Sequence, residues 1–344
     1  MLKRTILLAI MASCVWTTSV SADVISDWNE KAVGVVTALQ VPPPQAERVM
    51  AMVHVAMFDA VNAIERRYQP VIARVPSPMT ASREAAAATA AGTVLVGLYP
   101  EDAELSATMA AYLAPMPSSE VKSAGIRLGE AVAAQVLAAR AGDGSQAPDA
   151  YRPKAKAGVY IPTALTVGST WPHVKPFVLT SASQFRPQPP IPLGSDQWAV
   201  DYNEIKLLGA RTSSQRSARQ NEDARFWLTP GPVIYYPLVR QLATAKKLDL
   251  VDSARFMALV ALARNDAFVA VFDAKYHYDF WRPITAIRNG DMDENPNTER
   301  DATWQPIDNT PMHPEYPVRT ALWRGQSPRS SSSCSARQTY RRSP

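Results

Sequence analysis

Residues 273 to 283 read Asp273-Ala274-Lys275-Tyr276-His277-Tyr278-Asp279-Phe280-Trp281-Arg282-Pro283 and end the strongest helical pattern of the chain. Lys275 and Arg282 stand seven positions apart, which brings them within roughly 20° of the same helix face. An arginine fork and a lysine point charge together suit a tetrahedral oxyanion such as phosphate or vanadate. Pro283 disfavours helical geometry at Arg282, so we expect that side chain to swing off the helix end into a site shared with Lys275.

The residues around this pair bear on whether the two cations are solvated or buried. Most lysines and arginines are exposed, and the simplest interpretation makes both of these surface charges. Five aromatic residues surround them: Phe272, Tyr276, Tyr278, Phe280 and Trp281. Cations set in aromatic sequence indicate a partly buried cleft, where a bound anion would offset their desolvation.

Helical periodicity dominates the rest of the chain and predicts an all-α fold built from helical bundles. Apolar residues recur at helical spacing in seven stretches: residues 45–66, 81–98, 122–140, 198–208, 215–227, 238–245 and 251–281. No alternation of period two is long enough for a sheet. Residues 153–192 are dense in proline and predict a long irregular loop that crosses the surface.

The first residues have the features of a cleavable secretory signal. Lys3 and Arg4 precede a short apolar run, and small residues end the segment at Ala22. We expect residues 1–22 to be removed from an exported protein that is periplasmic or secreted. A lipid anchor at Cys14 is the rival interpretation. Cleavage would leave one cysteine, Cys334, so we expect no disulfide framework, and we expect no transmembrane segment.

The net charge of +5 is concentrated at the two ends of the chain. Lys3, Arg4 and six arginines after Pro317 carry eight positive charges, and neither end contains an acidic residue. Residues 23–317 are therefore mildly acidic. This distribution indicates neither a nucleic-acid groove nor a polybasic membrane patch.

The motif of a lysine, six residues and Arg-Pro resembles the first active-site block of a known superfamily. That superfamily joins the vanadium-dependent haloperoxidases with the type 2 phosphatidic acid phosphatases (PAP2). The flanking residues 264–268 and 281–287, with residues 52–62 and 184–187, resemble its bacterial haloperoxidase-like branch. The resemblance extends over about residues 35–317.

The resemblance implies a function and a set of site residues. In the family, the first-block lysine and arginine hold the oxyanion, which assigns vanadate or phosphate to Lys275 and Arg282. Vanadate bound there uses peroxide to oxidise halide, and small anions and peroxide are the expected partners. Asp273, Trp281 and His313 are the candidates for residues around the anion.

This sequence departs from the family's pattern in the later active-site blocks. Residues 313–317 resemble the approach to the second block, but residues 318–320 replace its Ser-Gly-His, and no third block follows. The resemblance therefore implies that the vanadium-ligating histidine is absent, that the C-terminal bundle is incomplete and that this chain is inactive, with weak oxyanion binding or none. A neighbouring reading frame of GC-rich codons can spell an apolar helix over residues 326–340. We therefore expect a frameshift in the gene or its sequence, and a disordered tail over residues 318–344.

The remaining candidate residues have simpler interpretations. His54 lies mid-helix among apolar residues and is predicted to be a core or interface histidine. His277 is about 200° around the helix from Lys275 and should face away from it. Asp266 and Asp273 could orient cations, although ordinary helix-face charge is the simpler interpretation. The acidic turn of residues 291–294 lacks EF-hand spacing and reads as a solvated loop.

Three functions remain open from the sequence. The first is haloperoxidase chemistry with vanadate, and the second is a phosphatase that binds phosphate with the same cations. The third is a non-catalytic remnant or binding protein, whose uncovered apolar face would favour partners or aggregation. Whether this chain is an enzyme, and its oligomeric state, stay undecided.

Overall fold

The computed structural model describes residues 23–229 and 231–317, and this part of the chain is all-α, as predicted. It forms no strand within those residues, and none of its helices is long and apolar enough to cross a membrane. The predicted signal (1–22) and tail (318–344) lie outside the described residues. The α-helices are α1 (Val24–Ala38), α2 (Pro43–Glu65), α3 (Arg83–Leu98), α4 (Ala103–Leu113), α5 (Glu120–Arg140), α6 (Asp196–Leu208), α7 (Ala218–Phe226), α8 (Gly231–Ala245), α9 (Leu250–Tyr278) and α10 (Pro283–Arg288). Two 3-10 turns, η1 (Trp171–His173) and η2 (Gly290–Met292), complete the set.

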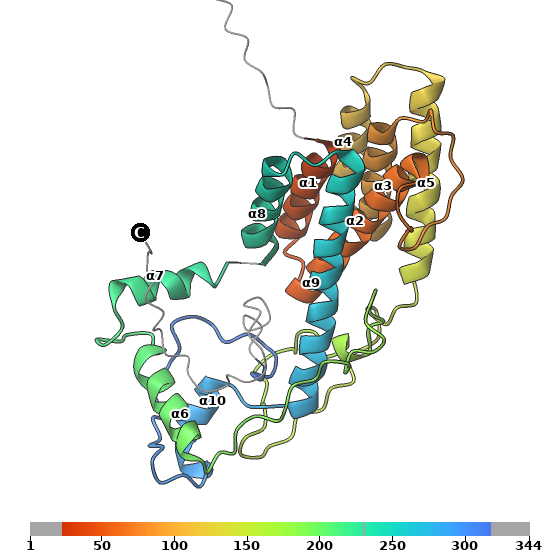
Figure 1. Cartoon of the computed structure of the whole chain (residues 1–344). Helices are drawn as coiled ribbons and strands as arrows, with labels where there is room; N and C mark the ends of the chain where they lie inside the picture. Colours follow the sequence, from red (N-terminus) through yellow and green to blue (C-terminus); the bar gives the residue numbers. More distant parts are fainter. Residues whose placement is uncertain (1–22, 230, 318–344) are drawn as a thin grey trace, which may run out of the picture.

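Helices α1 to α5, α8 and the first half of α9 form one bundle, at the top of Figure 1. Its centre is α2, which buries side chains along nearly its whole length and packs on α3, α5 and α9. The alanine-rich α3 lies very close to α5. A Cβ added at Gly129 of α5 would stand 2.6 Å from the carbonyl oxygen of Ala86, so only glycine permits this approach.

Two bundle helices lie where the sequence analysis predicted no element. The carboxylate of Asp23 caps α1 by accepting from Ser26 N at 2.8 Å, and Trp28 is buried beneath it. Asp102 caps α4 in the same manner, accepting from Glu104 N at 3.1 Å. Helix α4 buries only Leu105, so its apolar periodicity is weak.

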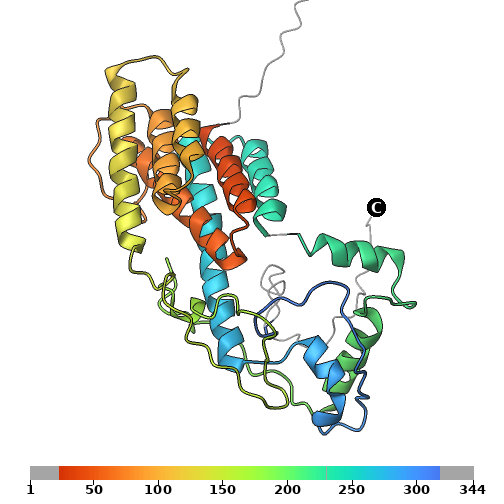
Figure 2. The same ribbon diagram turned by 180° about the vertical axis from the view of Figure 1, so that it is seen from behind.

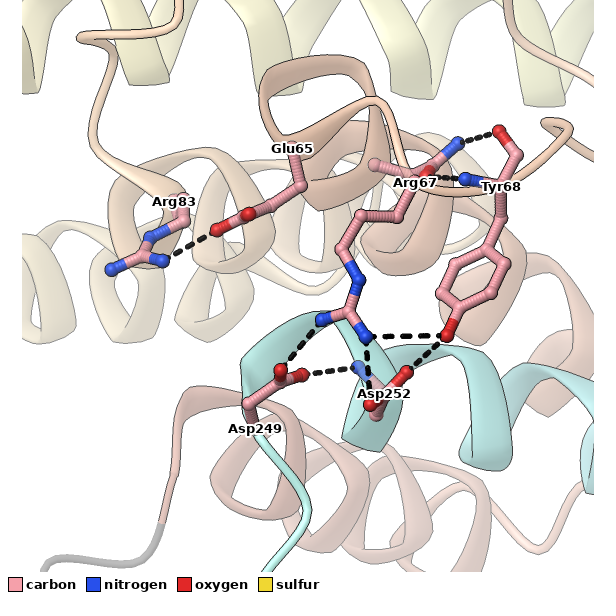
Figure 3. Close-up of polar contacts among 7 residues, drawn as sticks. Glu65, Arg67, Tyr68, Arg83, Asp249 and Asp252 are labelled. Atoms are coloured by element: carbon pink, nitrogen blue, oxygen red, sulfur yellow. Dashed lines mark hydrogen bonds and ion pairs between the residues drawn. The ribbon is translucent and has the colours of Figure 1, made fainter.

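Helix α9 leaves the bundle and carries the chain to a second, smaller cluster that contains α6 and α10 (Figures 1 and 2). The core of this cluster is aromatic, and Trp198 of α6 stacks on Trp281 with ring centroids 6.0 Å apart. At the other end of α9, Arg67 forms ion pairs with Asp249 and Asp252, whose carboxylate also accepts from the Tyr68 hydroxyl (Figure 3). Helix α9 therefore makes polar contacts at its start, and the chain just after its end packs into the aromatic cluster.

The proline-rich segment of residues 153–192 is irregular apart from η1, as predicted, but it is more than a surface loop. Tyr160, Trp171 and Val174 are buried. The carboxylate of Asp266 on α9 accepts hydrogen bonds from three consecutive backbone amides, those of residues 177, 178 and 179, at 2.7 to 2.9 Å. Asp266 is thus a buried anchor for this segment, which corrects its interpretation as a helix-face charge.

Candidate functional site

The candidate site lies where α9 ends and α10 begins. Lys275 is in the last turn of α9, which stops at Asp279 in the left-handed conformation (φ 50°). Arg282 lies beyond this end, as the extended residue preceding α10. The expectation that both cations share one helix face is therefore wrong in detail, whereas the expected departure of Arg282 from the helix before Pro283 is correct.

A short backbone ladder fixes the connection between the two helices. Tyr160 N donates to Asp279 O at 2.7 Å, and Trp281 N donates to Gly158 O at 3.0 Å. Residues 279–281 are thus paired along their length with residues 158–160 of the proline-rich segment. This pairing sets the direction in which the chain enters Arg282.

Lys275 is buried, with 1% of its surface exposed. Its ammonium group donates to the carbonyl oxygens of Pro314 at 2.9 Å and Glu315 at 2.6 Å. A buried ammonium group requires such partners, because its desolvation would otherwise be strongly unfavourable. The aromatic flanks thus predicted correctly that this lysine is not a solvated surface charge.

Arg282 is also buried, with 8% of its surface exposed, and it contacts the same short segment. Its Nε donates to the carbonyl oxygen of His313 at 2.6 Å, and its Nη2 donates to the ring Nδ1 of His313 at 2.9 Å. Its Nη1 forms an ion pair with the carboxylate of Glu315. Both cations therefore converge on residues 313–315, some 30 to 40 positions later in the chain.

The other predicted site residues divide between those near the cations and those directed elsewhere. His313 contacts Arg282 directly, and its ring packs edge-on against Phe272 with centroids 5.2 Å apart. The carboxylate of Asp273 instead holds Arg186 through two bonds of 2.8 and 2.9 Å. Trp281 directs its ring into the aromatic cluster with Trp198. Asp273 thus orients a cation other than Lys275 and Arg282, and its place around a bound anion stays a prediction.

Tyrosines also surround the helix junction, and two of them, Tyr151 and Tyr160, were missed by the sequence analysis. The hydroxyl of Tyr151 donates to Asp279 Oδ1 at 2.8 Å, and that of Tyr276 donates to Val167 O at 2.7 Å. Burial raises the pKa of Tyr160 to about 12, and the positive charge of Arg282 opposes part of that rise. Tyr151 and Tyr160 come from a segment without periodicity, so no sequence signal connects them to α9.

The remaining candidates lie apart from the cation pair. His54 is fully buried in the bundle, as predicted, and burial lowers its pKa to about 3. His277 is exposed. In the acidic turn, Asp293 is buried and accepts from the indole of Trp198 at 2.7 Å, so this turn is not simply a solvated loop. Within residues 23–229 and 231–317, no cluster of three metal-ligating side chains occurs.

The donor set fits a tetrahedral oxyanion. A planar guanidinium and an ammonium group, both buried and from adjoining elements, face the same side of the junction. The carboxylate of Glu315, which Arg282 holds, is a stand-in for such an anion: it places one negatively charged oxygen, Oε2, against Arg282 Nη1. Phosphate or vanadate would offer the same type of acceptor with greater charge.

Comparisons with known proteins show which proteins this chain resembles. Residues 255–325 match the family model described as the second helical-bundle domain of VCPO. A vanadium chloroperoxidase of Curvularia inaequalis is 27% identical over 179 residues, which cover 42% of this chain and 29% of that protein. The match thus spans less than a third of the length of this relative.

Two solved structures share the fold. A bacterial vanadium-dependent iodoperoxidase superposes with a TM-score of 0.69 at 22% identity, over 85% of this chain and 76% of its own. An apo-type bacterial vanadium-dependent chloroperoxidase superposes with a TM-score of 0.57 at 17% identity, over 80% and 74%. Together with the family model and the curated relative, they support the resemblance of this chain to the vanadium haloperoxidase and PAP2 superfamily, and they show that it shares the helical fold of these structures.

Proposed function

We propose that Lys275 and Arg282 form the oxyanion-binding part of a vanadium-dependent haloperoxidase centre. The observation that carries the proposal is the convergence of two buried cations on residues 313–315: Arg282 pairs with the Glu315 carboxylate, and Lys275 donates to the Glu315 backbone carbonyl. Burying two cations is unfavourable without anionic partners. Their retention at one helix junction is consistent with a site for a small, multiply charged anion.

In this proposal the two cations have different tasks. Arg282 binds the anion through Nη1, the nitrogen that pairs with Glu315, while its Nε and Nη2 stay bonded to His313, and Lys275 adds a compact charge from the last turn of α9. Vanadate, when bound, supplies the chemistry by which peroxide oxidises halide. The aromatic side chains beside the cations keep water from the anion and thereby strengthen each charge interaction.

Halide oxidation is proposed for a polypeptide that also carries the later sequence blocks of the family. The histidine that those blocks contribute is not recognisable in this sequence, and the histidine beside the cations, His313, already contacts Arg282. For the described residues we propose oxyanion binding. Phosphatase chemistry would use the same cations, and the named relatives, all vanadium-dependent peroxidases, favour the first function.

Calorimetric titration of the polypeptide with orthovanadate and with inorganic phosphate tests the proposal. We expect Lys275→Met and Arg282→Lys each to weaken binding roughly 10- to 100-fold, because each removes one charge-assisted contact. Lys246→Met removes an exposed lysine and is the matched control. Unchanged affinity in both site variants, with circular dichroism showing them folded, would overturn the proposal.

The type of chemistry is tested on a protein with the later blocks restored. Bromide oxidation that requires added vanadate would support the peroxidase function. Phosphomonoester hydrolysis that vanadate inhibits would support the phosphatase instead.

We further propose that the protein is exported, because residues 1–22 have the charged, apolar and small-residue order of a secretory signal. N-terminal sequencing of the protein recovered from cell fractions tests this. A periplasmic or secreted product that begins near Asp23 is expected, and an uncleaved cytoplasmic chain would contradict it.

A further inference from the structure

The anion that Arg282 holds in this structure belongs to the chain itself. The Glu315 carboxylate pairs with Arg282 Nη1, and its side chain is 25% exposed whereas that of Arg282 is 9% exposed. The Glu315 carboxylate is thus more accessible to solvent than the guanidinium with which it pairs, so an anion from solvent can compete for its place.

Glu315 is held in this position by its backbone. Its amide donates to Phe280 O at 3.0 Å, and its carbonyl oxygen accepts from Lys275 Nζ at 2.6 Å. The next residue, Tyr316, donates its hydroxyl to Gln188 O at 2.8 Å. These bonds do not involve the carboxylate, so the side chain can leave Arg282 while the segment stays in place.

Arg282 likewise does not depend on Glu315 for its orientation. Its Nε is fixed by the carbonyl of His313 and its Nη2 by the His313 ring, and the backbone before it is paired with residues 158–160. Removing the carboxylate would therefore leave the guanidinium aimed at the same place.

We propose that Glu315 determines the anion specificity of this site: its carboxylate occupies the position beside Arg282, and an oxyanion binds only by displacing it. The inference rests on the proposed oxyanion-binding function. An internal carboxylate competes at high effective concentration, so singly charged anions fail to displace it, whereas multiply charged phosphate or vanadate gains enough from both cations to do so. Glu315 thus makes the site select anions by their charge.

Substitution of Glu315 should change the affinity for anions in opposite directions, depending on whether Glu315 competes with the anion or only positions Arg282. If Glu315 competes with the anion, Glu315→Gln removes the competing charge and should tighten the binding of orthovanadate and inorganic phosphate by roughly tenfold or more. It should also allow nitrate, a planar monoanion, to bind measurably. If Glu315 only supported Arg282, the same substitution would weaken binding.

The experiment is calorimetric titration of the full chain and its variants with phosphate, orthovanadate and nitrate. Glu299→Gln is the control, because Glu299 pairs with Lys206 at 4.0 Å on the surface and its side chain is 92% exposed. Tighter phosphate binding by Glu315→Gln, with Glu299→Gln unchanged, supports the inference. Equal or weaker binding by Glu315→Gln overturns it.

A second variant covers the case in which Glu315→Gln does not fold. Glu315→Asp keeps the charge but withdraws it by one methylene, so its affinity for phosphate should lie above that of the wild type; equal or lower affinity overturns the inference. If the wild type binds phosphate or vanadate and neither variant binds it more tightly, the competition fails while the proposed function stands. If neither the wild type nor any variant binds an oxyanion, both the proposed function and the competition by Glu315 are wrong.

Discussion

Glu47 of α2 and Arg264 of α9 form an ion pair in the centre of the bundle, with 0% and 2% of their surfaces exposed. Arg264 Nε donates to Glu47 Oε2 at 2.8 Å, and Arg264 Nη2 bonds the other carboxylate oxygen. The guanidinium also lies over the ring of Tyr235, 4.6 Å from its centroid. This pair ties α9 to the bundle about three turns before Lys275.

Glu47→Gln should strongly destabilise the protein. It leaves Arg264 as a buried charge without its counter-ion, a loss of about 3–5 kcal/mol in the free energy of unfolding. Urea unfolding followed by circular dichroism measures it, with Glu104→Gln, at an exposed position of α4, as the control. A change below about 1 kcal/mol would show that the bundle tolerates the uncompensated charge.

Asp266→Asn should loosen the proline-rich segment while the bundle stays folded. Asparagine keeps one acceptor oxygen but loses the charge that holds the amides of residues 177–179, at a cost of about 2 kcal/mol. Hydrogen exchange at those amides should accelerate. Asp59→Asn is the matched variant, because Asp59 holds the amides of residues 71–73 in the same way, and exchange should rise there instead.

His54 is held in one neutral form by a short chain of hydrogen bonds. Arg240 can only donate, and its Nη1 bonds Asn29 Oδ1 at 2.6 Å. This turns the amide nitrogen of Asn29 toward His54 Nε2, 2.8 Å away, so that the ring accepts there and carries its hydrogen on Nδ1. A second ring proton would face the Asn29 amide hydrogens, and burial lowers the pKa of His54 to about 3.

Because of His54, the free energy of unfolding should therefore decrease as the pH is lowered. The unfolded chain binds the proton near pH 6.5 and the folded protein only near pH 3, so the unfolded state holds more protons between these values. Stability is complete above about pH 6.5 and is lost toward pH 3, by up to roughly 1.4 kcal/mol per pH unit. Urea unfolding between pH 7 and pH 4.5 should show a shallower loss in His54→Gln than in the wild type. The control His277→Gln, at an exposed site, should keep the wild-type slope.

The surface ion pairs at the start of α9 should contribute little. Arg67 lies between Asp249 and Asp252, at 2.6 and 3.0 Å (Figure 3), and the side chains involved are 31% to 58% exposed. We expect Arg67→Ala to lower the melting temperature by a few degrees at most in low salt and by less in 1 M salt, because solvent and ions screen such pairs. A large loss that persists in high salt would mean that this contact holds α9 in place.

The sequence predicted best what depends on neighbouring residues. The helical spacing of residues 251–281 and the break before Pro283 are local properties, and α9 and Arg282 lie nearly where those signals indicated, whereas the short α10 was not predicted. The aromatic flanks correctly indicated that the two cations are buried. Proline density likewise predicted an irregular segment between α5 and α6.

Contacts between distant residues could not be predicted in this way. Asp273 is bonded to Arg186, 87 positions away, and Lys275 to the carbonyl of Glu315, 40 positions away. Neither Arg186 nor Glu315 belongs to a periodic element, so no pattern in the chain pairs them with α9. Glu315 was not predicted as a site residue because the family motif places the expected site residues after Pro317.

The ladder between residues 279–281 and 158–160 also determines where this chain can change in length. An inserted or deleted residue between Tyr278 and Arg282 would shift the pairing and carry the guanidinium away from Lys275. Around Leu165, which is 91% exposed, an insertion would extend only into solvent. Over evolutionary descent, the number of residues in the junction is therefore under stricter constraint than their identity.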